Sequence, residues 1–249
     1  YTQLYNLDAV AYESVMLGVY SVFMGPPNFV AGKTGLPKIN DLKLAFSRDG
    51  FHFSRGNYTD FLSSSRRKGS WDYGYLHPAN GICTVEGDTL RFYYSAFSGA
   101  SPHFGSHKYS GGAVGVATLR RDGFCAMTAG DKGGTLLTEK LQYRGRHFFV
   151  NADCGQGELW AELLDENGAP LPGYGREDCC GLKNVDSTRV ELRWKGQLDG
   201  RPWPSVLRVR FGLRRAKLYA FWITDSPEGR SHGYLAAGSP EGSAQGRDE

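Results

Sequence analysis

The sequence predicts an all-β protein in which propeller blades are followed by a β-sandwich. Three observations lead to this prediction: a strand-and-turn segment that occurs twice, many apolar runs that end in tight turns, and a composition rich in glycine and aromatic residues. The chain has 249 residues, of which 34 are Gly and 13% are Phe, Trp or Tyr. This composition is typical of strands joined by tight turns.

The repeated segment ends each time in Arg-Asp-Gly-Phe. Residues 42–55 read LKLAFSRDGFHFSR, and residues 114–127 read VGVATLRRDGFCAM. Asp-Gly after an apolar run favours a tight turn, because glycine supplies the positive φ that such a turn needs. A strand and turn that recur at a long spacing indicate a repeated all-β unit such as a propeller blade. Residues 1–57 and 58–130 therefore read as two copies of one plan: inner strand, middle strand, long loop, outer strand and turn.

The first copy begins with an apolar stretch that could form a buried helix or two strands. Gly18 and the β-branched residues around it favour two strands, near residues 9–12 and 16–24. Residues 25–41 contain Pro and Gly at several positions and predict a loop.

The second copy opens with a polar loop over residues 56–75. Two strands are expected at residues 76–85 and 89–97, on either side of a Glu-Gly-Asp turn. A loop of Gly, Ser and His follows over residues 98–112 and leads to the second Arg-Asp-Gly segment. The two copies together predict a partial propeller over residues 1–130.

After about residue 131 the pattern changes to closely spaced strands. They are expected at residues 135–138, 147–152, 158–164, 188–195, 205–213 and 216–223. Asp-Glu-Asn-Gly at residues 165–168 is a hairpin signal. Regular strands with such turns predict a β-sandwich over residues 131–225. Residues 226–249, rich in Gly, Ser and Glu, predict a flexible tail.

Charge and composition exclude several classes of partner. The formal net charge of +3 and the lack of a long basic run predict no nucleic-acid partner. No apolar run reaches the roughly 18 residues of a transmembrane helix, so no membrane partner is expected. The five Cys match no metal-binding spacing, and we expect small buried thiols, no metal and no cofactor.

Localisation and completeness stay open at this level. No signal peptide is visible and the chain begins at Tyr1, so it reads either as a mature product or as a piece of something longer. A polysaccharide-active enzyme is often exported, and a secreted or periplasmic location is the corresponding expectation. The odd number of Cys leaves the redox compartment undecided.

Several segments together resemble a known group of enzymes. They are DAVAYESVMLG (8–18), the two Arg-Asp-Gly ends, GSWDYGYLHPANG (69–81) with TLRFYYSAFSG (89–99), and RVRFGLRRAKLYAFW (208–222). Their order is similar to that in the five-bladed β-propeller glycoside hydrolases of the family 32/43 kind, above all the β-fructosidase type with a C-terminal β-sandwich. The family's first-blade motif with its nucleophilic Asp is absent, and so is its Arg-Asp-Pro motif. Two blades cannot close a ring, so the chain resembles the C-terminal half only.

Glu13 is the candidate general acid/base. It lies in a run that is otherwise free of charge, where burial would raise its pKa and suit it to protonate a glycosidic oxygen. The resemblance implies the same role, since Tyr12-Glu13-Ser14 echoes the family's Glu-Cys motif, and it makes Tyr12 a substrate contact. The alternative is a Glu at a strand end that faces solvent. Asp8 would bind a sugar hydroxyl or tune Glu13, or else it caps a turn after Asn6.

The segment around Trp71 supplies the other candidate substrate contacts. Trp71, Asp72, Tyr75 and His77 bring rings, a carboxylate and an imidazole into a short stretch, and sugar sites use such groups. The alternative is that Trp71 and Tyr75 pack one blade against the next. In the predicted sandwich, Trp160, Trp194, Trp203 and Trp222 read mainly as core, with a surface sugar platform as the alternative.

The leading functional hypothesis is therefore a glycoside hydrolase acting on an oligo- or polysaccharide. Asp8 and Glu13 are separated by an odd number of residues and would face opposite sides of one strand. The nucleophile or second carboxylate is thus expected from a second chain or from a preceding segment that also supplies the missing blades. The alternative is a non-catalytic carbohydrate-binding or interaction module.

Overall fold

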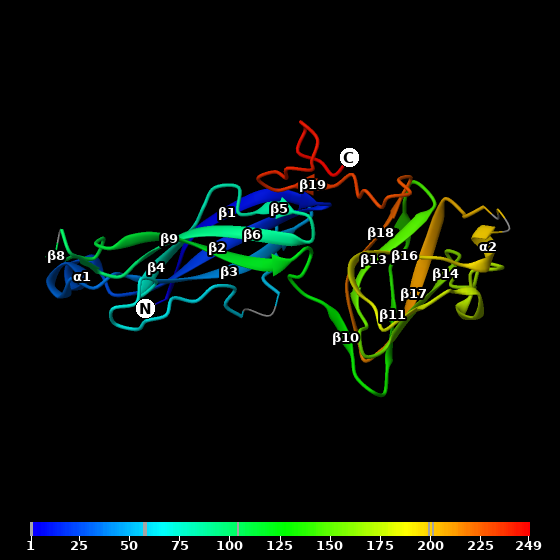
Figure 1. Cartoon of the computed structure of the whole chain (residues 1–249), viewed down its shortest axis with the longest axis horizontal. Helices are drawn as coiled ribbons and strands as arrows, with labels where there is room; N and C mark the ends of the chain where they lie inside the picture. Colours follow the sequence, from blue (N-terminus) through cyan, green and yellow to red (C-terminus); the bar gives the residue numbers. More distant parts are fainter. Residues whose placement is uncertain (1, 57–58, 104, 199, 201) are drawn as a thin grey trace. The chain divides into compact units, whose positions relative to one another are not determined.

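The computed structural model describes residues 2–56, 59–103, 105–198, 200 and 202–249. The protein is all-β, with 49% of the chain in strands and 5% in helices, and it contains a curled half-barrel sheet. The predicted fold class is confirmed at this level. The chain forms two compact units, Tyr1–Leu119 with Gly233–Asp248, and Arg120–His232 with Glu249, which we call unit 1 and unit 2 (Figure 1).

One sheet of unit 1 is built from the first three long strands of the chain. These are β1 (Gln3–Glu13), β2 (Val15–Gly25) and β3 (Ile39–Ser47). They pair antiparallel in this order, and β19 (Tyr234–Leu235) pairs with the other edge of β1. The central strand β2 is buried over most of its length, which explains its nearly continuous apolar sequence. Both strands predicted at the start of the chain are present, as parts of β1 and β2.

A short helix occupies part of the connection that was predicted as a loop. Helix α1 (Asn28–Thr34) begins directly after Pro27. It ends at Gly35, whose φ of 68° lies in the left-handed region and whose backbone N–H donates to the carbonyl oxygen of Ala31. Pro26 and Pro27 precede the helix, where proline is tolerated, and Pro37 follows its end.

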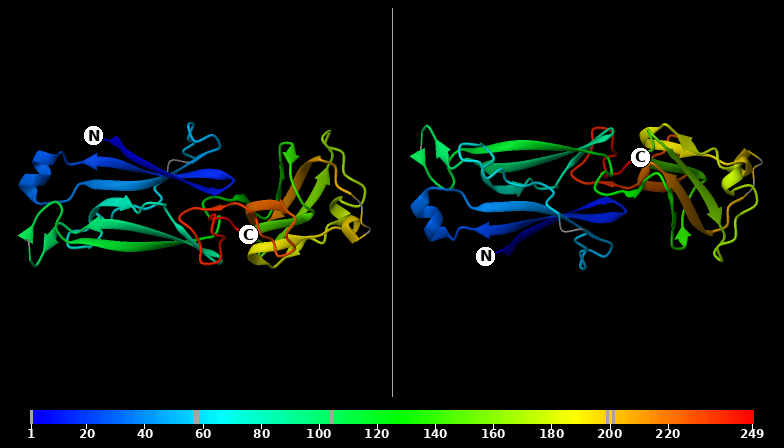
Figure 2. Two further views of the ribbon diagram at one scale, coloured as in Figure 1. Left: turned by 90° about the horizontal axis from the view of Figure 1, so that it is seen from above. Right: turned by 90° about the horizontal axis from the view of Figure 1, so that it is seen from below.

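A second sheet of unit 1 is formed by strands between residues 74 and 120. Its strands are β4 (Gly74–Pro78), β5 (Thr84–Glu86), β6 (Thr89–Phe97) and β9 (Gly112–Arg120). Strands β4, β5 and β9 all pair with β6. The loop before β9 carries the small ribbon β7 (Ala100–Ser101) and β8 (Gly105–Ser106). Figure 2 shows the two sheets of unit 1 as neighbouring layers.

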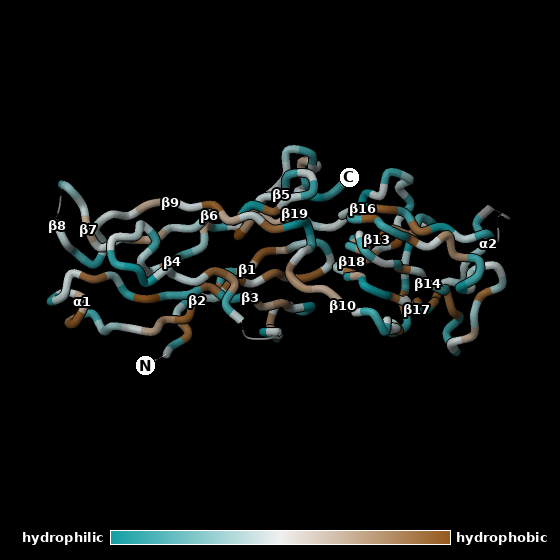
Figure 3. Tube along the Cα trace, turned by 60° about the horizontal axis from the view of Figure 1, so that its bottom comes forward, coloured by the Kyte–Doolittle hydropathy of each residue, from teal (hydrophilic) through white to brown (hydrophobic). Residues whose placement is uncertain are grey.

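The core of unit 1 draws on both sheets. Leu17 and Leu42 of the first sheet, and Leu76 and Leu90 of the second, are at most 1% exposed. Apolar residues recur along the strands, and the C-terminal end of the chain is more hydrophilic (Figure 3). The burial of these leucines explains why the sequence keeps apolar residues at alternating strand positions.

Each Arg-Asp-Gly segment directly follows the last strand of its copy, as the repeat predicts. The first follows β3 and the second follows β9. In the first turn Gly50 has a φ of 79°, and the carboxylate of Asp49 accepts hydrogen bonds from backbone N–H groups. In the second turn it is Asp122, with a φ of 57°, and not Gly123, that takes the left-handed conformation. The two turns share a sequence and a place in the plan but differ in backbone conformation.

Unit 2 consists of two antiparallel sheets around one hydrophobic core. The first has the order β10 (Met127–Ala129), β18 (Ala216–Thr224), β13 (His147–Asp153) and β16 (Asp186–Leu192). The second has the order β11 (Gly134–Leu137), β17 (Val206–Arg214), β14 (Glu158–Leu164) and β15 (Leu182–Lys183), and β12 (Leu141–Gln142) also pairs with β17. The 3-10 helix η1 (Arg176–Asp178) and helix α2 (Lys195–Leu198) lie in the connections. Fully enclosed core residues include Phe148, Leu163, Trp194 and Phe211.

The turn predicted after β14 is confirmed. The side-chain Oδ1 of Asp165 accepts a hydrogen bond from the backbone N–H of Asn167 at 2.9 Å. Gly168 has a φ of 90°, the positive φ that glycine supplies in a tight turn. The six strands expected after residue 131 correspond to β11, β13, β14, β16, β17 and β18.

The unit boundary and the end of the chain differ from the simple linear plan. The sequence pattern changes near residue 131, whereas unit 2 begins at Arg120. The side chain of Arg120 belongs to unit 2 because its Nε donates to Oδ1 of Asn151 at 2.8 Å.

The segment predicted as a flexible tail, residues 226–249, contains β19 and returns to unit 1, where β19 pairs with β1.

Candidate functional site: an aromatic cluster around Lys38

Three rings from two different strands meet in unit 1. Tyr5 lies on β1, while Tyr75 and His77 lie on β4. The ring centroids are 6.3 Å apart for Tyr5 and Tyr75, 5.6 Å for Tyr5 and His77, and 4.5 Å for Tyr75 and His77. The hydroxyl oxygens of the two tyrosines are 3.0 Å apart and share a hydrogen bond. The rings therefore form one polar and aromatic surface, although their residues are 70 positions apart in the chain.

A β-bulge directs each tyrosine into the cluster. The register of β1 against β2 shifts between Leu4 and Asn6, on either side of Tyr5. The register of β4 against β6 shifts between Gly74 and His77, on either side of Tyr75. Bulges redirect side chains and are common next to functional sites. Tyr75 also has a φ of 59°, which is rare for a residue with a bulky side chain.

Lys38 places a positive charge beneath the rings. The residue is 8% exposed, and its Nζ lies 5.7, 5.5 and 5.4 Å from the ring centroids of Tyr5, Phe23 and Tyr75. In the described part of the chain no carboxylate oxygen lies within 4.0 Å of this ammonium group. A buried cation is costly unless it is compensated, and here the faces of three rings provide the compensation.

Gly74 allows β4 to approach Lys38 closely. A Cβ atom at residue 74 would lie 2.4 Å from the backbone oxygen of Lys38. Any other residue would push the two backbones apart and separate the rings of β4 from the ammonium group. The glycine is therefore a structural requirement of the cluster.

Two further rings extend the cluster toward solvent. Phe97 and Tyr109 both lie 5.7 Å from Tyr75 between ring centroids. Tyr109 and Tyr5 are each 44% exposed. The cluster thus has a buried cation at its base and open aromatic faces at its surface.

Burial and nearby charges set the protonation of the polar groups. Burial lowers the pKa of His77; the charge of Asp8 opposes this shift and that of Lys38 adds to it. Burial, together with the hydrogen bond to Tyr5, raises the pKa of Tyr75 far above its usual value. At neutral pH the site therefore presents a neutral imidazole at His77 and a neutral phenol at Tyr75, each able to donate and accept hydrogen bonds.

A layer of buried polar side chains lies on the same face of the first sheet. Asn6 is directly opposite Ser21, and Asn40 is opposite Phe23, two residues further along β2. Paired residues and residues two apart share a face, so these side chains point the same way as Phe23. Ser21 and Asn40 are fully buried, and Oδ1 of Asn6, Oγ of Ser21 and both amide atoms of Asn40 have no hydrogen-bond partner among the described residues. Asn6 donates to Oδ2 of Asp8 at 2.9 Å, which links this layer to the cluster.

The predicted substrate contacts divide into two groups. Tyr75 and His77 belong to the cluster, and Asp8 lies near enough for its charge to act on the pKa of His77. Trp71 instead lies against the ring of Tyr94, with 5.9 Å between centroids, and is 42% exposed. Both residues belong to the second predicted copy, so this contact packs Trp71 within its own copy and not against the other one.

The carboxylate of Asp72 forms a hydrogen bond within its own loop. It accepts a short hydrogen bond from the hydroxyl of Ser70. Burial alone would raise the pKa of Asp72, but hydrogen bonds from Ser70 and Ser65 outweigh it and keep the pKa below its usual value. Asp72 is thus an ionised group that stabilises the loop before β4.

Glu13 lies at the far end of β1 from the aromatic cluster. It is the first residue of the two-residue turn between β1 and β2, with a φ of 48°. Its carboxylate lies against Gly233, where a Cβ atom would be 2.0 Å from Oε2. Five residues of extended strand separate Glu13 from Asp8, which corresponds to about 17 Å. Tyr12 is 3% exposed and forms part of the core.

Several residues of the cluster and of the polar layer were not selected by the sequence analysis, namely Tyr5, Phe23, Lys38, Phe97 and Tyr109 of the cluster and Asn6, Ser21 and Asn40 of the layer. Ser21 did leave a signal, since it interrupts an apolar strand with a polar side chain. The rings left none, because an aromatic residue on a strand is expected in any all-β core.

Comparison with known proteins adds no family to this description. Neither a protein-family model nor a curated protein sequence matches the chain. Within the described ranges, no helix is both long and apolar enough to cross a membrane. The same residues contain no group of three or more His, Cys, Asp and Glu side chains suited to hold a metal ion.

Proposed function

We propose that the protein binds carbohydrate through the aromatic cluster of unit 1. The observation that supports this most directly is the meeting of Tyr5, Tyr75 and His77 around a shared hydroxyl pair, beside Asp8. Ligand sites combine apolar or aromatic walls with a few convergent polar groups. Here the rings offer flat faces for the C–H side of a sugar. The neutral imidazole, the phenols and the carboxylate offer hydrogen bonds to its hydroxyl groups.

The architecture supports a relationship to propeller glycoside hydrolases. Each sheet of unit 1 contains an inner strand, a middle strand, a long loop, an outer strand and an Arg-Asp-Gly turn. We propose that these sheets are two blades of such a propeller and that unit 2 is the sandwich that follows it. The cluster then lies on the inner strands β1 and β4, which in a propeller line the central pocket.

Distance is the reason to prefer binding over hydrolysis. A retaining glycosidase holds its two carboxyl groups about 5–5.5 Å apart, and an inverting one about 6.5–9.5 Å apart. Asp8 and Glu13 are about 17 Å apart along β1, so they cannot flank one glycosidic bond. The carboxylates that the sequence offered do not form a catalytic pair within this chain.

Glycoside hydrolysis is the second candidate, and one observation favours it. Glu13 has a positive φ, and non-glycine residues in this conformation are concentrated at functional sites. In this alternative Glu13 is the proton donor and the second carboxylate comes from outside the chain. The assay therefore uses the chain together with the segment or chain that supplies the second carboxylate. Release of reducing sugar by this complex with wild-type Glu13 but not with Glu13→Gln would support the candidate, whereas equal release by both would exclude the role of Glu13.

Binding is tested by calorimetric titration with neutral oligosaccharides, beginning with fructo-oligosaccharides because of the resemblance to β-fructosidases. Tyr5→Ala removes an exposed ring of the cluster. Tyr93→Ala is the matched control, since Tyr93 is 40% exposed and lies outside the cluster. We expect the Tyr5 variant to bind at least tenfold more weakly, equivalent to about 1.4 kcal/mol, and the Tyr93 variant to bind like the parent. If no oligosaccharide binds, or if both variants bind equally well, the proposed site is wrong.

A further inference from the structure

Unit 2 contains a cavity that the proposed function does not use. Its volume is about 240 Å³, slightly below the range of pockets for drug-sized ligands, which begins at about 300 Å³. Its size fits one small ring. Its lining includes Arg146, His147, Tyr174, Glu191, Trp194 and Trp203.

Aromatic rings form the inner wall of this cavity. Tyr174 and Trp194 are at most 1% exposed, and the indole N–H of Trp194 donates to the backbone oxygen of Ala161 at 2.9 Å. Trp203 lies edge-on to both, with centroids 5.9 Å from Tyr174 and 6.5 Å from Trp194. Trp203 is only partly buried, and its indole N–H has no hydrogen-bond partner among the described residues. Trp194 is therefore a buried core residue, whereas the partly exposed side chain of Trp203 can contact a ligand.

An ordered ion network forms one part of the rim. The side chain of Glu191 is 12% exposed, and its Oε1 lies 2.7 Å from Nδ1 of His147. Its Oε2 accepts from Nε and from a terminal nitrogen of Arg193, both at 2.6 Å. Both carboxylate oxygens of Glu191 therefore have partners, and Glu191 holds the side chains of His147 and Arg193 in place.

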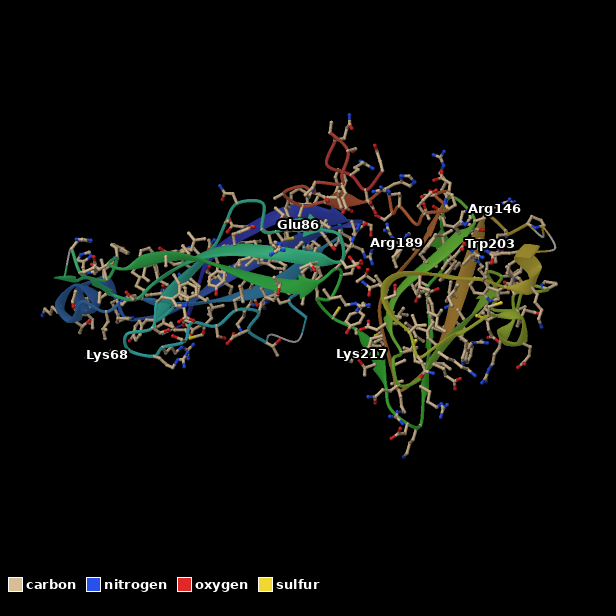
Figure 4. All side chains as sticks on the ribbon, in the orientation of Figure 1. Lys68, Glu86, Arg146, Arg189, Trp203 and Lys217 are labelled. Carbon is tan, nitrogen blue, oxygen red and sulfur yellow. The ribbon has the colours of Figure 1, made fainter. Side chains whose placement is uncertain are left out.

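Arg146 is a cation without an ionic partner. Its backbone is held on both sides: the N–H donates to Thr224, and the carbonyl oxygen accepts from Nε2 of Gln197 at 3.0 Å. Its guanidinium group makes no ion pair with a described residue. Figure 4 labels Arg146 and Trp203, two of the residues that line the cavity. The arginine fork matches a carboxylate with two parallel hydrogen bonds.

The geometry points to a second binding site in this cavity, for a single sugar ring that bears a carboxylate, that is, a uronic acid. The ring lies against Trp203 and the ring hydroxyl groups meet the ordered rim. The carboxylate pairs with the guanidinium group of Arg146. This site belongs to unit 2 and is independent of the cluster in unit 1.

The test is titration of the full chain with glucuronate and, as the neutral counterpart of the same size, glucose. Quenching of tryptophan fluorescence and calorimetry serve as the two measurements. We expect glucuronate to bind at least tenfold more tightly than glucose and its affinity to fall with rising salt, as for any exposed charge pair. No binding of glucuronate, or equal binding of the two sugars, would overturn the inference.

Two variants assign the binding to the cavity. Arg146→Gln removes the cation from an exposed position at the rim of the cavity and should weaken glucuronate binding at least tenfold. Arg144→Gln is the matched control, since Arg144 is 92% exposed, pairs with Asp225 and does not line the cavity. Equal loss in both variants would mean attraction by general charge and would refute the site. Binding of oligosaccharide to unit 1 should be unchanged in either variant, which separates this test from that of the proposed function.

Discussion

Replacing Asn40 by leucine should make unit 1 more stable. Asn40 is fully buried on β3, and neither its amide oxygen nor its amide nitrogen has a hydrogen-bond partner among the described residues. A buried polar group left unpaired costs about 1–3 kcal/mol, whereas an apolar side chain of similar shape at the same place carries no such cost. The side chain of leucine fits because Asn40 faces Phe23, an apolar neighbour.

The expected magnitude follows from these two unpaired groups. Asn40→Leu should raise the free energy of unfolding of unit 1 by about 1–3 kcal/mol. For a unit of this size each kcal/mol corresponds to a rise in Tm of about 3–5 °C. Differential scanning calorimetry measures the shift directly. Two units can give two unfolding transitions, so the transition shifted by Asn40→Leu must be assigned. An oligosaccharide bound to unit 1 raises the Tm of that unit alone, so a second scan with this ligand shows which transition belongs to unit 1.

Two controls accompany this measurement. Asn80→Leu makes the same exchange at an exposed position of unit 1, where the change should stay within about 0.5 kcal/mol. Asn40→Asp introduces a buried charge and should destabilise the unit strongly. If Asn40→Leu lowers Tm by 3 °C or more, its amide is satisfied by ordered water, and our account of an unpaired polar layer is refuted.

Three other predictions concern the same fold. Because burial lowers the pKa of His77 below its ordinary 6.5, the unfolded chain binds more protons in the window beneath that value, so the stability of unit 1 should fall as pH drops from 7 to 5. His77→Gln should flatten this part of a plot of Tm against pH, and an unchanged slope would contradict the assignment. Gly74→Ala should destabilise unit 1 by about 1–3 kcal/mol because its Cβ meets the Lys38 backbone, whereas Gly32→Ala, with no atom within 4 Å, should be neutral or stabilising in thermal melts. Mass spectrometry after brief alkylation at pH 8 should find Cys125 and Cys180 labelled first, since both are exposed while burial raises the pKa of the other three thiols.

Much of the fold could be predicted from local signals. Alternating apolar residues and the β-branched run around Gly18 give the strands β1 and β2, and the two Arg-Asp-Gly segments mark the ends of β3 and β9. These signals suffice because a strand must bury one face and must end where the backbone turns. Helix α1 was missed because seven residues between prolines carry too little periodicity to identify.

The candidate site was harder to predict because it depends on contacts between distant residues. Sequence reasoning selected Glu13, a charge in an apolar run, and that charge occupies a hairpin turn. Lys38 gave no signal, since its burial depends on rings contributed by β1, β2 and β4. The sequence shows where a residue differs in polarity from the residues next to it in the chain. It does not show which distant residues come together in the folded protein.

The surface of the aromatic cluster depends on a register shift in each of the two strands that carry its tyrosines. Regular strands would direct alternate side chains strictly to opposite faces of each sheet. The extra residue in β1, beside Tyr5, and that in β4, beside Tyr75, break this alternation where the two tyrosines meet. They bring two hydroxyl groups to 3.0 Å from each other above a buried ammonium group. Regular pairing supplies the stability of these sheets, and the two local departures from it create the surface to which we assign the binding of sugar.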